Sequence, residues 1–102
     1  MYLLEFSVLP VNKGDSISPY VARCLELVDA SGLDYRLHAM GTDVEGELDD
    51  LLGLLQKCLA AVTADCDRVS CSIRLDYRKG EQGRLKNNIA SVEQELRRKL
   101  KS

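Results

Sequence analysis

Several residue types are scarce in this chain, and their scarcity narrows the possible functions. Its 102 residues include no tryptophan, one phenylalanine, one histidine and two prolines. No stretch approaches the roughly 18 consecutive apolar residues of a membrane-spanning helix, so we expect no membrane-spanning helix. The first six residues lack a basic region and place an acid at Glu5, which is unlike a signal peptide. We therefore expect a cytoplasmic protein.

Histidine and cysteine are too few, or too widely spaced, for the common catalytic and metal motifs. Cys24, Cys58, Cys66 and Cys71 form no C-x-x-C pair, and without a secretory signal we expect buried, reduced thiols. A zinc site would need histidine ligands or paired cysteines, and His38 is the only histidine, so no metal is expected. No serine lies in a nucleophile elbow, so a Ser-His-Asp set is not visible.

Charge is distributed unevenly along the chain. The formal net charge is −2, but residues 1–67 contain 4 basic and 12 acidic residues, whereas residues 68–102 contain 10 and 4. Such a chain can pair its own ends or pair with a second copy. A polyanion-binding protein needs a net positive face, and an RNA-binding sheet needs exposed aromatics. Here Tyr2, Phe6 and Tyr77 are predicted to be buried, so nucleic acid is not the expected partner.

Hydrophobic periodicity predicts the elements in the first half of the chain. Residues 2–9 alternate between an apolar face and a face with Glu5 and Ser7, which is typical of a half-buried strand. Ser18 followed by Pro19 fits a helix N-cap, and Gly32 fits a stop, so a helix is predicted over about 17–31. Two strands, at 34–40 and 42–47, would meet at Gly41.

The second half predicts a helix, a strand and a further helix. One apolar stripe marks the second helix: Leu48, Leu51, Leu52, Leu55, Leu59 and Val62. The period then changes to two over residues 69–78, where one face is apolar: Val69, Cys71, Ile73, Leu75 and Tyr77. A polar loop over 79–88 precedes a helix over about 88–100 with a narrow stripe of Ile89, Val92, Leu96 and Leu100.

The order β-α-β-β-α-β, followed by one more helix, predicts a single α+β domain over residues 1–102. A right-handed crossover and a hairpin give a ferredoxin-like four-stranded antiparallel sheet with two helices on one face. The other face would present Glu5, Ser7, Ser70, Ser72, Arg74 and Asp76. By strand parity we also place His38, Met40 and Thr42 on that face. It must be solvated, covered by a partner, or used for binding.

Several chemistries can be weighed on this open face. Gly41 and Gly46 have the spacing of a phosphate loop, but Glu47 stands where that loop requires lysine, so phosphate is not the expected ligand. Glu5 and Asp76 would suit an acid–base pair, although neutralisation of both by Arg74 is the favoured interpretation. His38 is a candidate base, although a single strand histidine is more often structural.

Three motifs in register resemble a known family. They are Glu5-Phe6-Ser7-Val8-Leu9-Pro10, then Tyr35-x-Leu37-His38-x-Met40-Gly41-Thr42-x-x-Glu45-Gly46-Glu47, and Ser72-Ile73-Arg74-Leu75-Asp76-Tyr77-Arg78. Together they resemble the small thiamine-binding protein family, the UPF0045 or MTH1187/YkoF-like group. The resemblance implies a ferredoxin-like fold assembled into dimers or tetramers. It also implies non-catalytic binding of thiamine or its hydroxymethylpyrimidine part.

The resemblance leads to a hypothesis for ligand contacts. An aminopyrimidine needs hydroxyl or carboxylate partners and a close backbone edge, and a cationic thiazolium suits acids and soft apolar groups. We expect polar contacts from Ser7, Thr42 and Glu45, and a wall formed by Met40 and the backbone of Gly41. Two alternatives remain open: a small enzyme using Glu5 or His38 as base, and a purely structural homo-oligomer.

Overall fold

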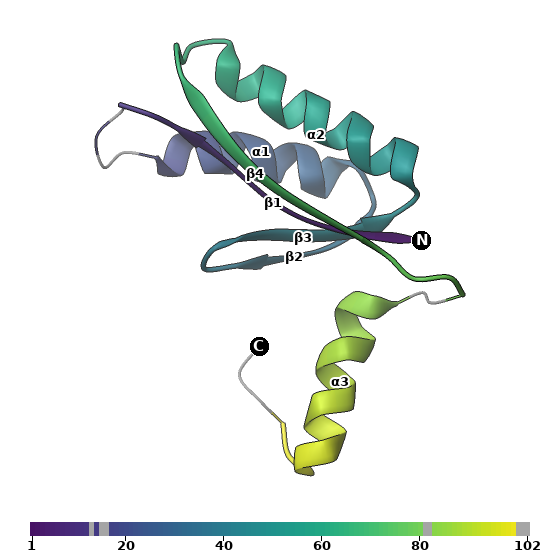
Figure 1. The fold of residues 1–102 in the computed structure, drawn as a ribbon. Helices are drawn as coiled ribbons and strands as arrows, with labels where there is room; N and C mark the ends of the chain where they lie inside the picture. The colour runs from purple at the N-terminus through teal and green to yellow at the C-terminus, as the bar shows by residue number, and fades with distance from the viewer. Residues whose placement is uncertain (13, 15–16, 81–82, 100–102) are drawn as a thin grey trace.

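The computed structural model describes residues 1–12, 14, 17–80 and 83–99. It contains four strands and three helices in these residues (Figure 1). Their bounds are β1 Tyr2–Pro10, α1 Ser18–Ala30, β2 Asp34–His38, β3 Gly41–Gly46, α2 Leu48–Thr63, β4 Val69–Tyr77 and α3 Arg84–Leu96. The order confirms the ferredoxin-like α+β arrangement with an additional C-terminal helix. No helix in the described part of the chain has the length and apolar content to cross a membrane.

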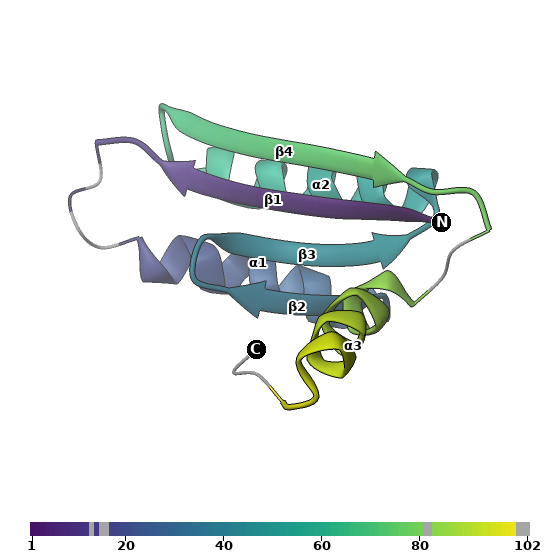
Figure 2. The same cartoon turned by 60° about the horizontal axis from the view of Figure 1, so that its bottom comes forward.

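The strands form one antiparallel sheet in the order β2-β3-β1-β4. Helices α1 and α2 cover one face, and α3 lies on the opposite side, below β2 and β3 in Figure 1. Figure 2 shows that β1 and β4 are not covered by α3 on this second face. The open face predicted from the sequence is therefore covered at one end by the chain itself.

The core lies between β1, β3 and the first two helices. Leu4 and Val44 from the sheet, Val28 from α1 and Leu51 from α2 are fully buried. The alternation predicted for residues 2–9 is confirmed, because every second residue of β1 from Leu4 to Pro10 is buried. Apolar side chains at these alternating and helical spacings bury one face of each element, which stabilises the layered arrangement.

β4 departs from the predicted burial. Its alternating face lies on the helix side, where Leu75 is opposite Leu4, and Ile73 opposite Phe6. However, Ile73 and Tyr77 are 50% and 55% exposed, because β4 is the outermost strand and the helices pack over β1 and β3. The sheet therefore ends in a nine-residue strand with an apolar, solvent-exposed stripe.

Helix ends also differ from the sequence prediction. α1 has Ile17 at its N-cap and Ser18 as its first residue, with no side-chain cap bond. α3 begins at Arg84, four residues earlier than predicted, after Gly83 in the left-handed region with φ 70°. Two residues predicted for the apolar stripe of α3 lie outside the described part of the chain: Leu100 entirely, and Ile89 in its side chain. The early start of α3 has a cause in β3, described below.

Candidate functional site

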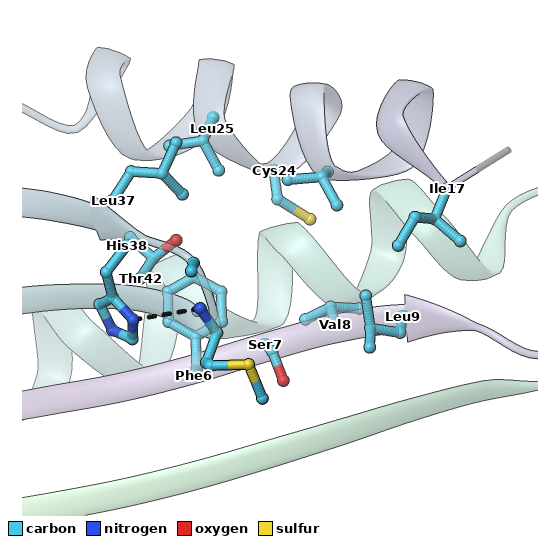
Figure 3. Close-up of a pocket in the computed structure, with 14 residues that line it drawn as sticks. Phe6, Ser7, Val8, Leu9, Ile17, Cys24, Leu25, Leu37, His38 and Thr42 are labelled. Atoms are coloured by element: carbon cyan, nitrogen blue, oxygen red, sulfur yellow. Dashed lines mark hydrogen bonds between the residues drawn. The ribbon is translucent and has the colours of Figure 1, made fainter. Parts of the chain in front are cut away.

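A cavity of about 240 Å³ lies between α1, β1 and the β2–β3 turn. Its walls are mostly apolar, with Phe6 and Val8 from β1, Val21 and Leu25 from α1, and Leu37 from β2 (Figure 3). Ligand sites are typically concave and apolar with a few polar groups that fix orientation. This cavity has that character.

Four of the five predicted contact residues border this cavity: Ser7, Met40, Gly41 and Thr42. Met40, in the turn, is 85% exposed. Ser7 lies opposite Ser72 on the open face, and its hydroxyl points away from α1 in Figure 3. The structure thus brings these four residues together, but their contact with a ligand stays a prediction.

The predicted orientation of Thr42 is wrong. Thr42 pairs with Phe6 and Leu37, so it faces the helices, and it is only 4% exposed. The parity argument failed because His38 pairs with Gly41 across a two-residue turn. In such a hairpin Gly41, the cross-strand partner of His38, lies on the same face as His38. Thr42, the next residue, therefore lies on the opposite face. Thr42 is therefore a buried hydroxyl at the cavity.

At Gly41 the backbone of β3 passes close to the backbone of β1. A Cβ atom at this position would lie 2.9 Å from the Phe6 carbonyl oxygen. Contacts that short are not tolerated without movement of the β1 backbone. Glycine here keeps β1 and β3 paired at the edge of the cavity.

Glu45 lies apart from the cavity and is engaged by α3. Its side chain, on a residue 4% exposed, accepts the Gly83 N–H at 2.6 Å and the Leu85 N–H at 3.5 Å. The carboxylate thus serves as the cap of α3, which explains why that helix begins at Arg84. Arg84, which is 6% exposed, pairs with Asp76 and lowers the pKa of its carboxyl group.

The open face brings together two acids and the only histidine. His38 Nε2 lies 3.0 Å from Asp43 Oδ1 and 3.5 Å from Glu5 Oε2. The favoured interpretation, that Arg74 neutralises Glu5 and Asp76, holds only in part. The nearest partners are His38 for Glu5 and Arg84 for Asp76. Arg74 lies opposite Glu5 in the β1–β4 ladder, and its charge adds to that of Arg84 in lowering the pKa of Asp76. Sequence reasoning missed Asp43, although the hairpin register would have placed it beside His38.

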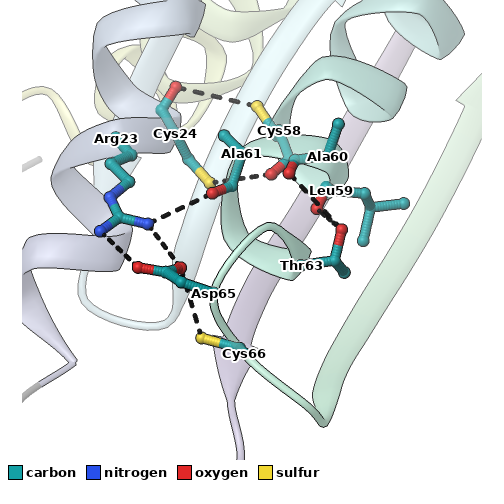
Figure 4. A network of polar contacts seen from close by, with 9 residues as sticks. All are labelled: Arg23, Cys24, Cys58, Leu59, Ala60, Ala61, Thr63, Asp65 and Cys66. Carbon is teal, nitrogen blue, oxygen red and sulfur yellow. Dashed lines mark hydrogen bonds and ion pairs between the residues drawn. The ribbon is translucent and has the colours of Figure 1, made fainter.

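Two of the four thiols connect the helices that cover the sheet. Cys24, Cys58 and Cys66 are buried, Cys71 is partly buried, and all four are free. The sulfurs of Cys24 and Cys58 each approach the other's carbonyl oxygen at 3.8 Å, which joins α1 to α2 (Figure 4). The bond with Cys24, together with burial, raises the pKa of the Cys58 thiol, and burial raises that of Cys71. Protonated thiols of this kind are poor nucleophiles.

Comparison with known proteins assigns the chain to a family. The family model described as thiamine-binding protein matches residues 4–93. The chain belongs to this family. A UPF0045 protein of Methanocaldococcus jannaschii is 33% identical over 88 residues, covering 86% of this chain and 88% of that protein. The UPF0045 protein YqgV of Bacillus subtilis is 33% identical over 102 residues, covering 94% and 98%.

Solved structures share the fold of this chain. The crystal structure of the Methanocaldococcus jannaschii protein superposes with a TM-score of 0.83 at 32% identity, covering 89% of this chain and 94% of that one. A Thermotoga maritima protein, described as a candidate thiamine biosynthesis or salvage protein, gives a TM-score of 0.79 at 16% identity, covering 89% and 97%. At that identity the second comparison shows the fold alone.

Proposed function

We propose that this protein binds thiamine or a related aminopyrimidine without chemical conversion, as a cytoplasmic homo-oligomer. The observation that supports this most directly is the apolar cavity beside the β2–β3 turn, bordered by four predicted contact residues, in a member of the thiamine-binding protein family. Four free thiols accord with a reducing compartment.

The size of the cavity favours one ring over the whole of thiamine. Pockets for drug-sized ligands typically enclose about 300–1,000 Å³. The cavity, at about 240 Å³, is smaller. We therefore propose that the aminopyrimidine ring enters between α1 and β1, and that the thiazolium remains at the mouth beside the exposed thioether of Met40. Thioethers are polarisable and suit such a cation.

Thr42→Val is expected to weaken hydroxymethylpyrimidine and thiamine binding by about 3- to 10-fold, because a buried hydrogen bond contributes roughly 0.5–1.5 kcal/mol. Isothermal titration calorimetry measures this loss. Thr63→Val is the matched control, since its hydroxyl is exposed and bonds the Leu59 carbonyl oxygen of its own helix at 2.8 Å. The control should bind like the wild type. If the wild-type protein gives no binding heat with thiamine and none with hydroxymethylpyrimidine, the proposed ligand is refuted.

Self-association is proposed to use the free edge of β4. An unpaired edge strand presents backbone donors and acceptors to another chain. The stripe of Ile73, Leu75 and Tyr77 beside this edge is 40–55% exposed. Antiparallel pairing of two β4 strands would place the two stripes side by side and satisfy the backbone groups of both edges, so the partner we propose is a second copy of this chain.

Ile73→Lys is expected to convert the oligomer to monomer, because two copies of the new charge would face each other across the paired edges. Light scattering after size-exclusion chromatography measures the mass. Gln56→Lys adds the same charge at an exposed position of α2 and should leave the mass unchanged. A wild-type monomer at high concentration, or an Ile73→Lys oligomer of unchanged mass, would contradict this interface.

A further inference from the structure

We propose that Glu5, His38 and Asp43 form a binding site for a divalent transition-metal ion on the open face of the sheet. One ligand atom from each residue lies within 4.8 Å of the other two. The residues come from three adjacent strands, β1, β2 and β3, so the sheet itself fixes their spacing. This site adjoins the cavity, which His38 also borders, but its argument does not depend on the ligand proposed above.

The distances suit ligands of one ion. Zinc binds imidazole nitrogen and carboxylate oxygen at about 2.0–2.2 Å, which puts neighbouring donors of a tetrahedral ion about 3.4 Å apart. His38 Nε2 lies 3.0 Å from the Asp43 oxygen and 3.5 Å from the Glu5 oxygen. Small side-chain rotations would therefore suffice to bind an ion, and water would occupy the remaining position.

Electrostatics also favour a cation at this place. Glu5 and Asp43 are directly opposite each other in the β1–β3 ladder. Like charges at such positions destabilise a sheet. Arg74 and Arg36 are the next partners in the same row, opposite Glu5 and Asp43 respectively. Within the part of the chain that the structure describes, His38 is the only titratable side chain within ion-pair distance of the two carboxylates. A divalent ion would neutralise both acids.

The donor set selects the class of metal. Imidazole is a ligand for zinc, copper, iron and nickel, whereas magnesium and calcium prefer oxygen alone. The side chains of the three residues are 51%, 32% and 27% exposed for Glu5, His38 and Asp43, so an ion has access from solvent. One nitrogen and two oxygen donors leave the site open to water or an added ligand.

Binding would change the β2–β3 turn. The Met40 N–H donates to His38 Nδ1 at 3.4 Å, drawn as the dashed line in Figure 3. A neutral imidazole that binds metal through Nε2 has its proton on Nδ1, so Nδ1 no longer accepts this bond. The Met40 amide must therefore move or bond elsewhere, which makes its NMR signal a reporter of metal binding.

The experiment is a titration of chelator-treated full-length protein with Zn²⁺, followed by calorimetry and by the backbone amide signals. We expect one ion per chain and a shift of the Met40 amide. His38→Ala and Asp43→Asn should each weaken binding at least 10-fold. Asp50→Asn, which removes an exposed acid at the start of α2, should not. Mg²⁺ should not compete at equal concentration. The melting temperature of each variant without metal verifies its folding.

Thiols are the main competing zinc ligands, so the titration is repeated with Co²⁺. Oxygen and nitrogen ligands give no thiolate-to-cobalt charge-transfer band, whereas cysteine ligation does. The proposal is overturned if that band appears, if both His38→Ala and Asp43→Asn bind like the wild type, or if Zn²⁺ does not bind. Because no thiamine is present in these titrations, failure here leaves the proposed ligand untouched, and failure of thiamine binding leaves this site untouched.

Discussion

Glu45→Ala is expected to lower the free energy of unfolding by about 2–3 kcal/mol. The substitution removes the acceptor of two backbone N–H groups at the start of α3, those of Gly83 and Leu85. A hydrogen bond to a charged group contributes about 1.5–3 kcal/mol, and a donor left buried without a partner costs a similar amount. Urea unfolding followed by circular dichroism measures the change.

Hydrogen exchange separates loss of α3 from loss of the whole fold. In Glu45→Ala, the amides of α3 should exchange faster than those of β1, because α3 packs on β2 and β3 at one end of the sheet only. Glu47→Ala is the matched control: Glu47 is exposed at the N-cap of α2 and forms no side-chain cap bond there. Equal stability of the two variants would show that the Glu45 carboxylate does not hold α3.

The same variant tests the predicted contact of Glu45 with the ligand. Glu45 is paired with Leu3 and Asp34, away from the cavity. Thr42 is on the helix side of the sheet and faces the cavity. If Glu45 acts only through α3, Glu45→Ala will change stability and leave hydroxymethylpyrimidine affinity unchanged in calorimetry. A loss of affinity comparable to that of Thr42→Val would instead show a direct role.

Local periodicity was sufficient to predict the fold. The alternation of β1 depends on neighbouring residues and matches the structure. The stripe of α2 matches in part: Leu51, Leu55 and Val62 are buried, but Leu52 is 40% exposed. Leu54 and Cys58, which were not predicted for this stripe, are also buried. The exposure of Ile73 and Tyr77 could not be predicted in this way, because periodicity shows which face a residue shares but not which strand is at the edge. That requires the order of strands in the sheet.

The site was less predictable because it depends on residues distant in sequence. Glu45 contacts Gly83, 38 residues away, and no local pattern indicates that pairing. The Glu5–His38–Asp43 cluster likewise requires the sheet order and the hairpin register. Thr42 was assigned to the wrong face of the sheet because the length of the β2–β3 turn was not predicted correctly. A shift of one residue reverses the face of every following side chain.

Gly41→Ala is expected to destabilise the protein by about 1–3 kcal/mol, the usual cost of an overpacked site. The new methyl group would lie 2.9 Å from the Phe6 carbonyl oxygen, which belongs to the backbone of β1 and cannot rotate away. Relief requires β1 and β3 to separate next to the cavity. Hydroxymethylpyrimidine binding should therefore weaken at least 10-fold, more than in Thr42→Val.

Two other glycines provide the controls for this substitution. At Gly46 the nearest atom to a new Cβ is Leu33 Cδ2 at 3.3 Å, the end of a flexible side chain, so Gly46→Ala should cost less than Gly41→Ala. Gly53 lies within α2 with nothing within 4 Å of a new Cβ, so Gly53→Ala should stabilise the protein by about 0.5–1 kcal/mol. Urea unfolding should therefore give the lowest free energy of unfolding for Gly41→Ala, a higher one for Gly46→Ala and the highest for Gly53→Ala. A Gly41→Ala protein as stable as the wild type, with unchanged affinity, would show that the close approach of β3 to β1 is not required for either property.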